Sequence, residues 1–293
     1  MSHRRLPLVA RAVSQPPVDP HVAVRAAQRL NRAAGLLALS VLADSGLEHY
    51  RGDFHNPAMV APLVSASLGL AASGHGVGDR RHGAHLARDA AHAASAATGF
   101  AGLAFHLYNV GKRPGGFSWH NLFYAAPLGA PGALVLSGLL GFFAERVRDN
   151  RPGAVPTTFG LPAGRTSAAI ASVGLLGTVA EAALLHFRGA FQDPFMVLPV
   201  TVPPITAALL ANTARGTARR HRGFTRFFLR ATAALGFLGV GFHALGIARN
   251  MGGWRNWTQN IQNGPPLPAP PSFTGLALAG LAALGLLEDD PDA

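Results

Sequence analysis

The chain has 293 residues, of which 49% are hydrophobic and only 13% are charged, and its net charge is +11. Soluble domains carry about 25% charged residues, so the composition disfavours a soluble globular protein of this size and favours an integral membrane protein. The basic residues lie between apolar runs rather than on one face, which argues against a nucleic-acid-binding protein. Cysteine is absent, which excludes disulfides, iron–sulfur clusters, thiolate zinc sites and covalently attached c-type haem.

Eight apolar segments follow one another along the chain, each long enough to cross about 30 Å of hydrocarbon as a helix. They lack the two-residue alternation of barrel strands, so we expect helices. The predicted spans are residues 33–50, 57–74, 89–111, 122–144, 167–187, 194–213, 229–248 and 271–287. The sequence therefore predicts an all-α integral membrane protein with eight transmembrane helices.

The two halves of the chain repeat each other at a constant offset of 137 residues. Leu47 to Pro62 reads LEHYRGDFHNPAMVAP, and Leu184 to Pro199 reads LLHFRGAFQDPFMVLP, with nine identities in sixteen positions. After a two-residue insertion, Asn121 to Pro131 matches Asn260 to Pro270. We therefore predict a tandem repeat of two four-helix units, and we expect any site among the positions that both copies keep.

The distribution of Lys and Arg predicts the orientation. With the N-terminus inside, 19 of the 25 basic residues fall on inner segments and six on outer ones. This follows the positive-inside rule and predicts that both termini are cytoplasmic. Because each unit has an even number of helices, we expect the two copies to share one orientation.

The predicted organisation has five parts. They are a basic cytoplasmic tail (residues 1–28), a first four-helix membrane unit (29–148), a Pro/Gly-rich cytoplasmic linker (149–165), a second membrane unit (166–288) and an acidic tail (289–293). Pro16, Pro17 and Pro20 interrupt the N-terminal segment, which therefore lacks the continuous apolar region of a cleaved signal. A simple positive-inside pattern without a transit peptide favours a bacterial inner membrane.

Two histidine positions are kept in both copies, and both lie toward the outer side of the predicted helices. His49 corresponds to His186, and His106 corresponds to His243. The first and third helices of a unit run in the same direction and can face each other diagonally, which allows two imidazoles to bind one haem iron. We expect a b-type haem between His49 and His106, and another between His186 and His243. The alternatives are a non-haem metal on the same histidines, a proton or substrate site, and histidines that only hydrogen-bond between helices.

Two further features fit a cofactor near the outer face. Arg51 and Arg188 each follow a histidine by two residues and could bind a haem propionate or an anionic substrate, whereas an arginine in the headgroup layer is the alternative. Small residues around the second histidine of each pair could make room for a porphyrin. They are Gly99, Ala101 and Gly102 in the first unit and Gly236, Gly239 and Gly241 in the second.

Two fused four-helix units with paired histidines are similar in layout to the haem A synthase family. That family has a Glu-x-x-His-Arg motif, whereas here Glu48 is adjacent to His49, and Tyr50 stands between His49 and Arg51. The histidines also fall on the first and third spans of each unit instead of the second and fourth. The resemblance therefore concerns architecture alone, and no residue role is carried over.

Asp44, Glu48 and Glu181 are acidic residues in the interior of predicted apolar spans, where a charge is costly. Asp44 corresponds to Glu181, each five residues before a histidine, whereas Glu48 corresponds to Leu185. Five residues turn a helix by about 500°, so Asp44 lies about 140° around the helix from His49 and need not share its site. These acids support an alternative function, a transporter or channel that uses Asp44 and Glu181.

The expected function is that of a redox membrane protein, a haem- or metal-binding electron-transfer subunit that works with a redox partner subunit. A third possibility is a membrane scaffold or assembly factor whose polar residues serve packing. Phosphate-binding glycine motifs, nucleophile elbows and the metalloprotease His-Glu-x-x-His motif are absent from the sequence, which weakens a hydrolase or nucleotide-binding function.

Overall fold

The computed structural model describes residues 20–125, 127–151, 154–216 and 222–288, and these residues are about 80% helical. The predicted acidic tail and most of the predicted basic tail lie outside these residues. The α-helices are α1 (Pro20–Arg51), α2 (Ala61–Gly78), α3 (Leu86–Gly111), α4 (Trp119–Tyr124), α5 (Gly129–Arg148), α6 (Ala163–Arg188), α7 (Val202–Ala214), α8 (Arg222–Arg249), α9 (Trp257–Asn263) and α10 (Pro271–Glu288). The 3-10 helices η1 (Pro57–Val60), η2 (Pro194–Val200) and η4 (Gly253–Asn256) and a hairpin of β1 (Thr157–Thr158) and β2 (Leu161–Pro162) complete the described elements.

Six helical segments among the described residues are long and apolar enough to cross a membrane. They are Pro57–Gly78, Gly129–Arg148, Ala163–Arg188, Pro194–Ala214, Arg222–Arg249 and Pro271–Glu288. The all-α membrane class is therefore supported. Helices α1 and α3 are long enough but are not among these six apolar segments, and α1 carries Arg25, Arg29 and Arg32. The count of eight spans stays a prediction.

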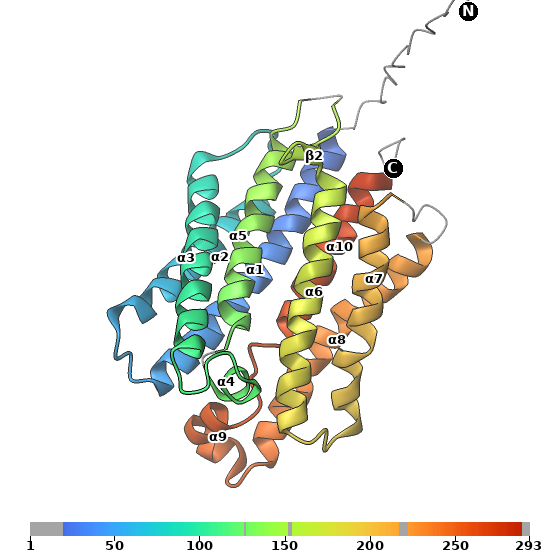
Figure 1. Ribbon diagram of the computed structural model, residues 1–293. Helices are drawn as coiled ribbons and strands as arrows, with labels where there is room; N and C mark the ends of the chain where they lie inside the picture. The colour runs from blue at the N-terminus through green and yellow to red at the C-terminus, as the bar shows by residue number, and fades with distance from the viewer. Residues whose placement is uncertain (1–19, 126, 152–153, 217–221, 289–293) are drawn as a thin grey trace, which may run out of the picture.

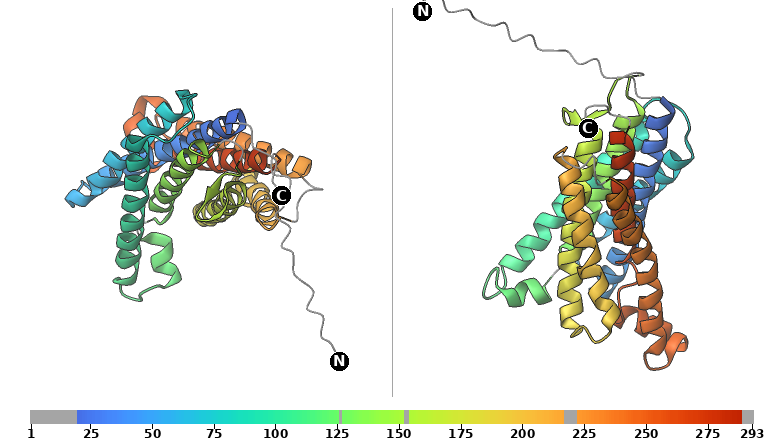
Figure 2. Two further views of the ribbon diagram at one scale, coloured as in Figure 1. Left: turned by 90° about the horizontal axis from the view of Figure 1, so that it is seen from above. Right: turned by 90° about the vertical axis from the view of Figure 1, so that its right-hand side faces the viewer.

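The long helices lie side by side in two groups of four (Figure 1). In the first group α1 and α3 each pack on α2 and on α5, so that α1 and α3 lie diagonally opposite each other. In the second group α6 and α8 each pack on α7 and on α10. The groups meet where α1 packs on α10 and α5 on α6, and the end-on view in Figure 2 shows α1 next to α10.

The core lies at this meeting place. The apolar stretches of α5 and α10 are 61% and 72% buried, against 17–28% for those of α2, α6, α7 and α8. Small side chains dominate the core, among them Ala27, Ala34, Ala277 and Ala283, each fully buried. Small residues let helix backbones approach closely, which is how helices associate when the surrounding solvent is itself apolar. The outward faces carry exposed Phe, Leu and Val side chains, as lipid contact requires.

Short helices cover one end of each group. α4 and α9 lie at the end opposite the start of α1 and the end of α10 (Figure 1). We call the α4 and α9 end the outer end, following the predicted orientation, and the opposite end the inner end. The buried Asn121 of α4 donates to the carbonyl of Gly116 at 2.7 Å, and the buried Asn260 of α9 donates to that of Gly253 at 2.8 Å. Gly116 and Gly253 have positive φ angles of 58° and 52°, which favour glycine.

The predicted span 122–144 differs from the helix observed. Residues from Trp119 form the separate helix α4, and α5 begins only at Gly129. Pro127 has no amide hydrogen to donate to a helix, so the chain leaves one helix and starts another around it. This break exposes the Pro127 carbonyl, which the first histidine pair uses.

Candidate functional site

The first histidine of each pair lies at the outer end of a helix, where the chain turns back sharply. After His49, the left-handed residues Asp53 (φ 53°) and Phe54 (φ 45°) reverse the chain, and Asn56 caps η1 by accepting from the Ala58 amide at 2.9 Å. The turn brings the carbonyl of Met59 to 2.6 Å from His49 Nδ1. Both left-handed residues are non-glycine, so this turn is a strained conformation that the surrounding contacts hold.

The same turn occurs 137 residues later. Ala190 (φ 55°) and Phe191 (φ 46°) are left-handed, and Asp193 caps η2 by accepting from the Phe195 amide at 2.9 Å. His186 Nδ1 lies 2.8 Å from the carbonyl of Met196. Both copies of the repeat therefore place a methionine carbonyl against the histidine ring in the same way.

The second histidine of each pair uses a carbonyl in the proline-rich segment before α5 or α10. His106 Nδ1 hydrogen-bonds to the carbonyl of Pro127, and His243 Nδ1 lies 2.7 Å from that of Pro266. A carbonyl can only accept, so Nδ1 carries the hydrogen in all four rings. In the neutral form of each ring, Nε2 then holds the free lone pair, and none of the four Nε2 atoms is hydrogen-bonded to a residue that the structure describes. This tautomer is the one a histidine needs to bind a metal through Nε2.

The structure describes all four histidines of the predicted pairs. The two histidines of a pair come from the diagonal helices of one group, α1 with α3 and α6 with α8. All four rings are partly exposed. The pairing of the four histidines stays a prediction.

The glycines expected to make room for a porphyrin have another role. A Cβ on Gly99 would lie 2.5 Å from the Val135 amide, and one on Gly236 would lie 2.9 Å from the Thr274 amide. Gly102 and Gly239 face Pro131 and Pro270 in the same way, at 3.2 and 2.8 Å. These glycines let α3 approach α5 and α8 approach α10, so that expectation was wrong for them. A Cβ on Gly241 would meet no atom within 4 Å, so this glycine borders open space.

The two outer arginines already have partners. Arg51 forms an ion pair with Glu48, one turn away on α1. The guanidinium of Arg188 lies 5.0 Å from the ring centre of Tyr124 and donates to the carbonyl of Phe123 at 3.4 Å. Because Phe123 and Tyr124 belong to α4, Arg188 ties the second group to the first.

The three intramembrane acids meet at the boundary between the groups. The charges of Asp44 and Glu48 act on Glu181. The carboxylate of Glu181 lies against the backbone of Gly129, because a Cβ on Gly129 would lie 1.5 Å from Oε2. Among the described residues, no group of three or more His, Asp or Glu side chains is arranged to hold a metal ion. A non-haem metal site that adds acidic ligands to a histidine pair therefore finds no support in the described part of the chain.

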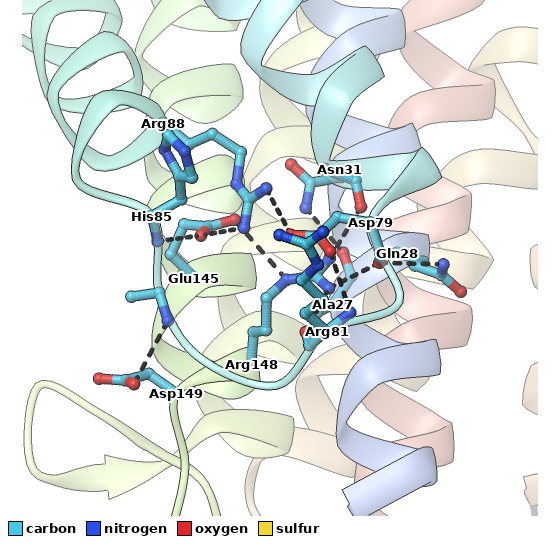
Figure 3. A network of polar contacts seen from close by, with 12 residues as sticks. Ala27, Gln28, Asn31, Asp79, Arg81, His85, Arg88, Glu145, Arg148 and Asp149 are labelled. Carbon is cyan, nitrogen blue, oxygen red and sulfur yellow. Dashed lines mark hydrogen bonds and ion pairs between the residues drawn. The ribbon is translucent and has the colours of Figure 1, made fainter.

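A buried ionic network at the inner end was missed from the sequence (Figure 3). Arg88 on α3 donates to Asp79 and to Glu145, each at 2.8 Å, and Arg148 Nε lies 3.9 Å from Glu145. Arg148 also donates to the carbonyls of Gly76, Asp79 and Arg81. Burial raises the pKa of the Asp79 carboxyl, but the Arg81 amide, the Arg88 guanidinium and the Arg148 charge lower it more, to about 2.

The network belongs to the first group alone. At the offsets of the repeat, its positions hold uncharged residues in the second half: Gly216 for Asp79, Thr225 for Arg88, Leu284 for Glu145 and Leu287 for Arg148. From the sequence, these arginines are inner-loop charges that indicate orientation. What distinguishes them in the sequence is that the second half has uncharged residues at the same positions. A comparison that looks only for residues shared by both halves does not find them.

Neither a known protein family, nor a curated protein, nor a solved structure matches this chain.

Proposed function

We propose that this protein is a membrane electron-transfer subunit that binds one haem b between His49 and His106 and another between His186 and His243. The observation that carries the proposal is that all four histidine rings make the same kind of hydrogen bond. Each donates from Nδ1 to a backbone carbonyl and leaves Nε2 free, and the two members of each pair lie on the diagonal helices of one group. A bound haem would supply an iron that carries one electron.

The proposal includes the architecture. We infer eight membrane spans in two tandem four-helix units, with both termini cytoplasmic, in a bacterial inner membrane. Support comes from features that recur at the offset of the repeat, including the left-handed turns, the four histidine bonds and the asparagine bonds of α4 and α9. Helices α1 and α3 lie alongside the six apolar spans (Figure 1), and they complete the first group. Redox partners would then meet both haems on the same side of the membrane.

An absorption spectrum tests the haem proposal. The detergent-purified protein, produced with ample haem, is measured oxidised and dithionite-reduced, with haem and metal content determined on the same sample. We expect a Soret band that sharpens on reduction and two haems per chain. His106→Ala or His243→Ala should leave one haem, and the double variant none. A colourless wild-type protein would overturn the proposal.

A matched control is available on the outer side. His55 and His120 are exposed and correspond to Gln192 and Gln259 in the second half. His55→Gln and His120→Gln should leave both haems in place. If either substitution removed a haem as completely as His106→Ala, the assignment of ligands would be wrong.

The second candidate is a transporter or channel. It is favoured by the approach of Asp44 and Glu181, which come from different halves of the chain and interact across the boundary between the groups. Reconstituted in vesicles, such a protein would show a pH-dependent flux that Asp44→Asn with Glu181→Gln stops. Flux unaffected by both substitutions would exclude this use of the acids.

A further inference from the structure

The segment before α5 is held from two sides. The carbonyl of Pro127 accepts from His106, and the carboxylate of Glu181 lies against the backbone of Gly129, two residues later. Gly129 is the first residue of α5, so its amide is one of those that have no partner within the helix. The positive end of the helix dipole also favours a carboxylate there. Only Leu128 separates the two contacts.

Glu181 reaches this segment from the other half of the chain. It lies on α6, whereas His106 lies on α3 and the segment leads into α5. The carboxylate fills the space where any side chain at position 129 would begin, because a Cβ there would come within 1.5 Å of Oε2 and 2.2 Å of the carboxyl carbon. The absence of a side chain at Gly129 is therefore a condition for the contact.

The corresponding contact cannot form in the second half. Asp44 corresponds to Glu181, and Pro268 corresponds to Gly129. Proline has no amide hydrogen, so it has nothing to donate to a carboxylate. Instead, Ser40 of α1 donates to the carbonyl of Pro268 and lies 3.0 Å from Ser272. The segment that supports His243 is thus held by hydroxyl groups, and the one that supports His106 by a carboxylate.

We propose that Glu181 is a positioning residue for the first histidine pair alone. By holding Gly129, it fixes the Pro127 carbonyl against His106 Nδ1, and this bond sets the orientation of the ring and the basicity of Nε2. Partners of ligating histidines affect metal affinity in this way. The inference rests on the proposed haem sites. The charged groups that act on Glu181 or its neighbours are Asp44, Glu48 and Arg51, all on α1.

Single-site proteins make the test direct. His243→Ala leaves only the first haem site, and His106→Ala leaves only the second. In the first background, Glu181→Leu should weaken haem binding by roughly 10-fold and shift the midpoint potential, as loss of an outer partner does. In the second background, Glu181→Leu should change neither. Glu181→Gln, which keeps an acceptor oxygen for the Gly129 amide, should restore most of the affinity.

Substitution of the other partner gives an independent check. Gly129→Ala places a Cβ where the carboxylate lies, so it should reproduce the effect of Glu181→Leu at the first site. Asp44→Asn is the matched control and should leave the second site unchanged. Equal effects of Glu181→Leu on both sites, or no effect on the first, would overturn the proposal.

The role of Glu181 can be tested even if the protein binds no haem. If no variant binds haem, the haem proposal fails, and the positioning role is read from the nitrogen NMR signals of the histidine rings in the colourless protein. Glu181→Leu should then shift the Nδ1 signal of His106 and leave that of His243 in place. Unchanged signals for both rings would overturn it.

Discussion

Arg88 and Glu145 form a 2.8 Å ion pair between α3 and α5, with side chains that are 2% and 0% exposed. Removing one partner of a buried pair leaves a charge without compensation, which costs about 3–5 kcal/mol. Here Glu145 also faces Arg148, so its loss would leave two guanidinium groups on one acid, Asp79.

We therefore expect Glu145→Ala to lower the free energy of unfolding by about 3–5 kcal/mol. The measurement is denaturant unfolding in detergent micelles, followed by circular dichroism. Asp149→Ala is the control, because Asp149 is at the end of the same helix and accepts only from the Ala84 amide at 3.3 Å. A loss for Glu145→Ala no larger than that for Asp149→Ala would show that the pair contributes little.

The second half of the chain indicates how to replace the three most buried charged residues of the network together, leaving only the partly exposed Asp79. Its residues at the positions of Arg88, Glu145 and Arg148 are buried and uncharged. They are Thr225, Leu284 and Leu287. Replacing a buried ionic group by apolar residues of similar volume is often neutral or stabilising.

The triple variant Arg88→Thr, Glu145→Leu, Arg148→Leu should therefore be more stable than Glu145→Ala alone, although it changes three residues instead of one. The same unfolding measurement compares them. Limited proteolysis should show faster cleavage in residues 79–85 of the triple variant, because Arg148 no longer donates to Asp79 and Arg81. A triple variant less stable than Glu145→Ala would mean that the network is needed for the fold of the first group.

Low pH should remove the contribution of the Asp79 carboxylate to the stability of the fold. Its pKa is lowered from 3.8 to about 2 in the fold, so its stabilising contribution is present above about pH 4 and is lost as the pH falls toward 2. We expect the difference in thermal midpoint between the wild type and Asp79→Asn to be largest above pH 4 and to shrink below it. Other carboxyl groups titrate in both proteins and cancel in the difference. A difference that is constant from pH 5 to pH 2 would contradict the assigned shift.

The sequence and the structure agree where the physical cause is local or repeated. Apolar length predicts the helices, and the offset of 137 residues predicts that the same turn follows His49 and His186. The ionic network was missed since Arg88 and Arg148 are close in sequence to loop arginines, and only their packing against Glu145 distinguishes them. Small residues were also assigned wrongly, because a glycine that opens a space and one that lets a helix approach have the same sequence pattern. Gly99 and Gly236 are of the second kind.

The ring of His92 lies flat against α5 at Gly141. A Cβ on Gly141 would lie 2.2 Å from Nδ1 of His92 and 2.4 Å from Cγ, and the ring is fully buried. We expect Gly141→Ala to destabilise the protein by about 1–3 kcal/mol, since extra atoms in a packed core force neighbours to shift. His92→Ala in the same chain should relieve most of this loss, and chemical unfolding of the single and double variants measures the coupling.

Gly132 on the same helix is the matched control. A Cβ there meets no atom within 4 Å, and alanine is favoured over glycine in a helix by up to about 1 kcal/mol, so Gly132→Ala should be neutral or stabilising. The difference between the two substitutions isolates the contact with His92 from the general effect of adding a methyl group to α5. If Gly141→Ala and Gly132→Ala were equally tolerated, or if His92→Ala did not relieve the loss, close packing of the ring on α5 would not limit the stability of the first group.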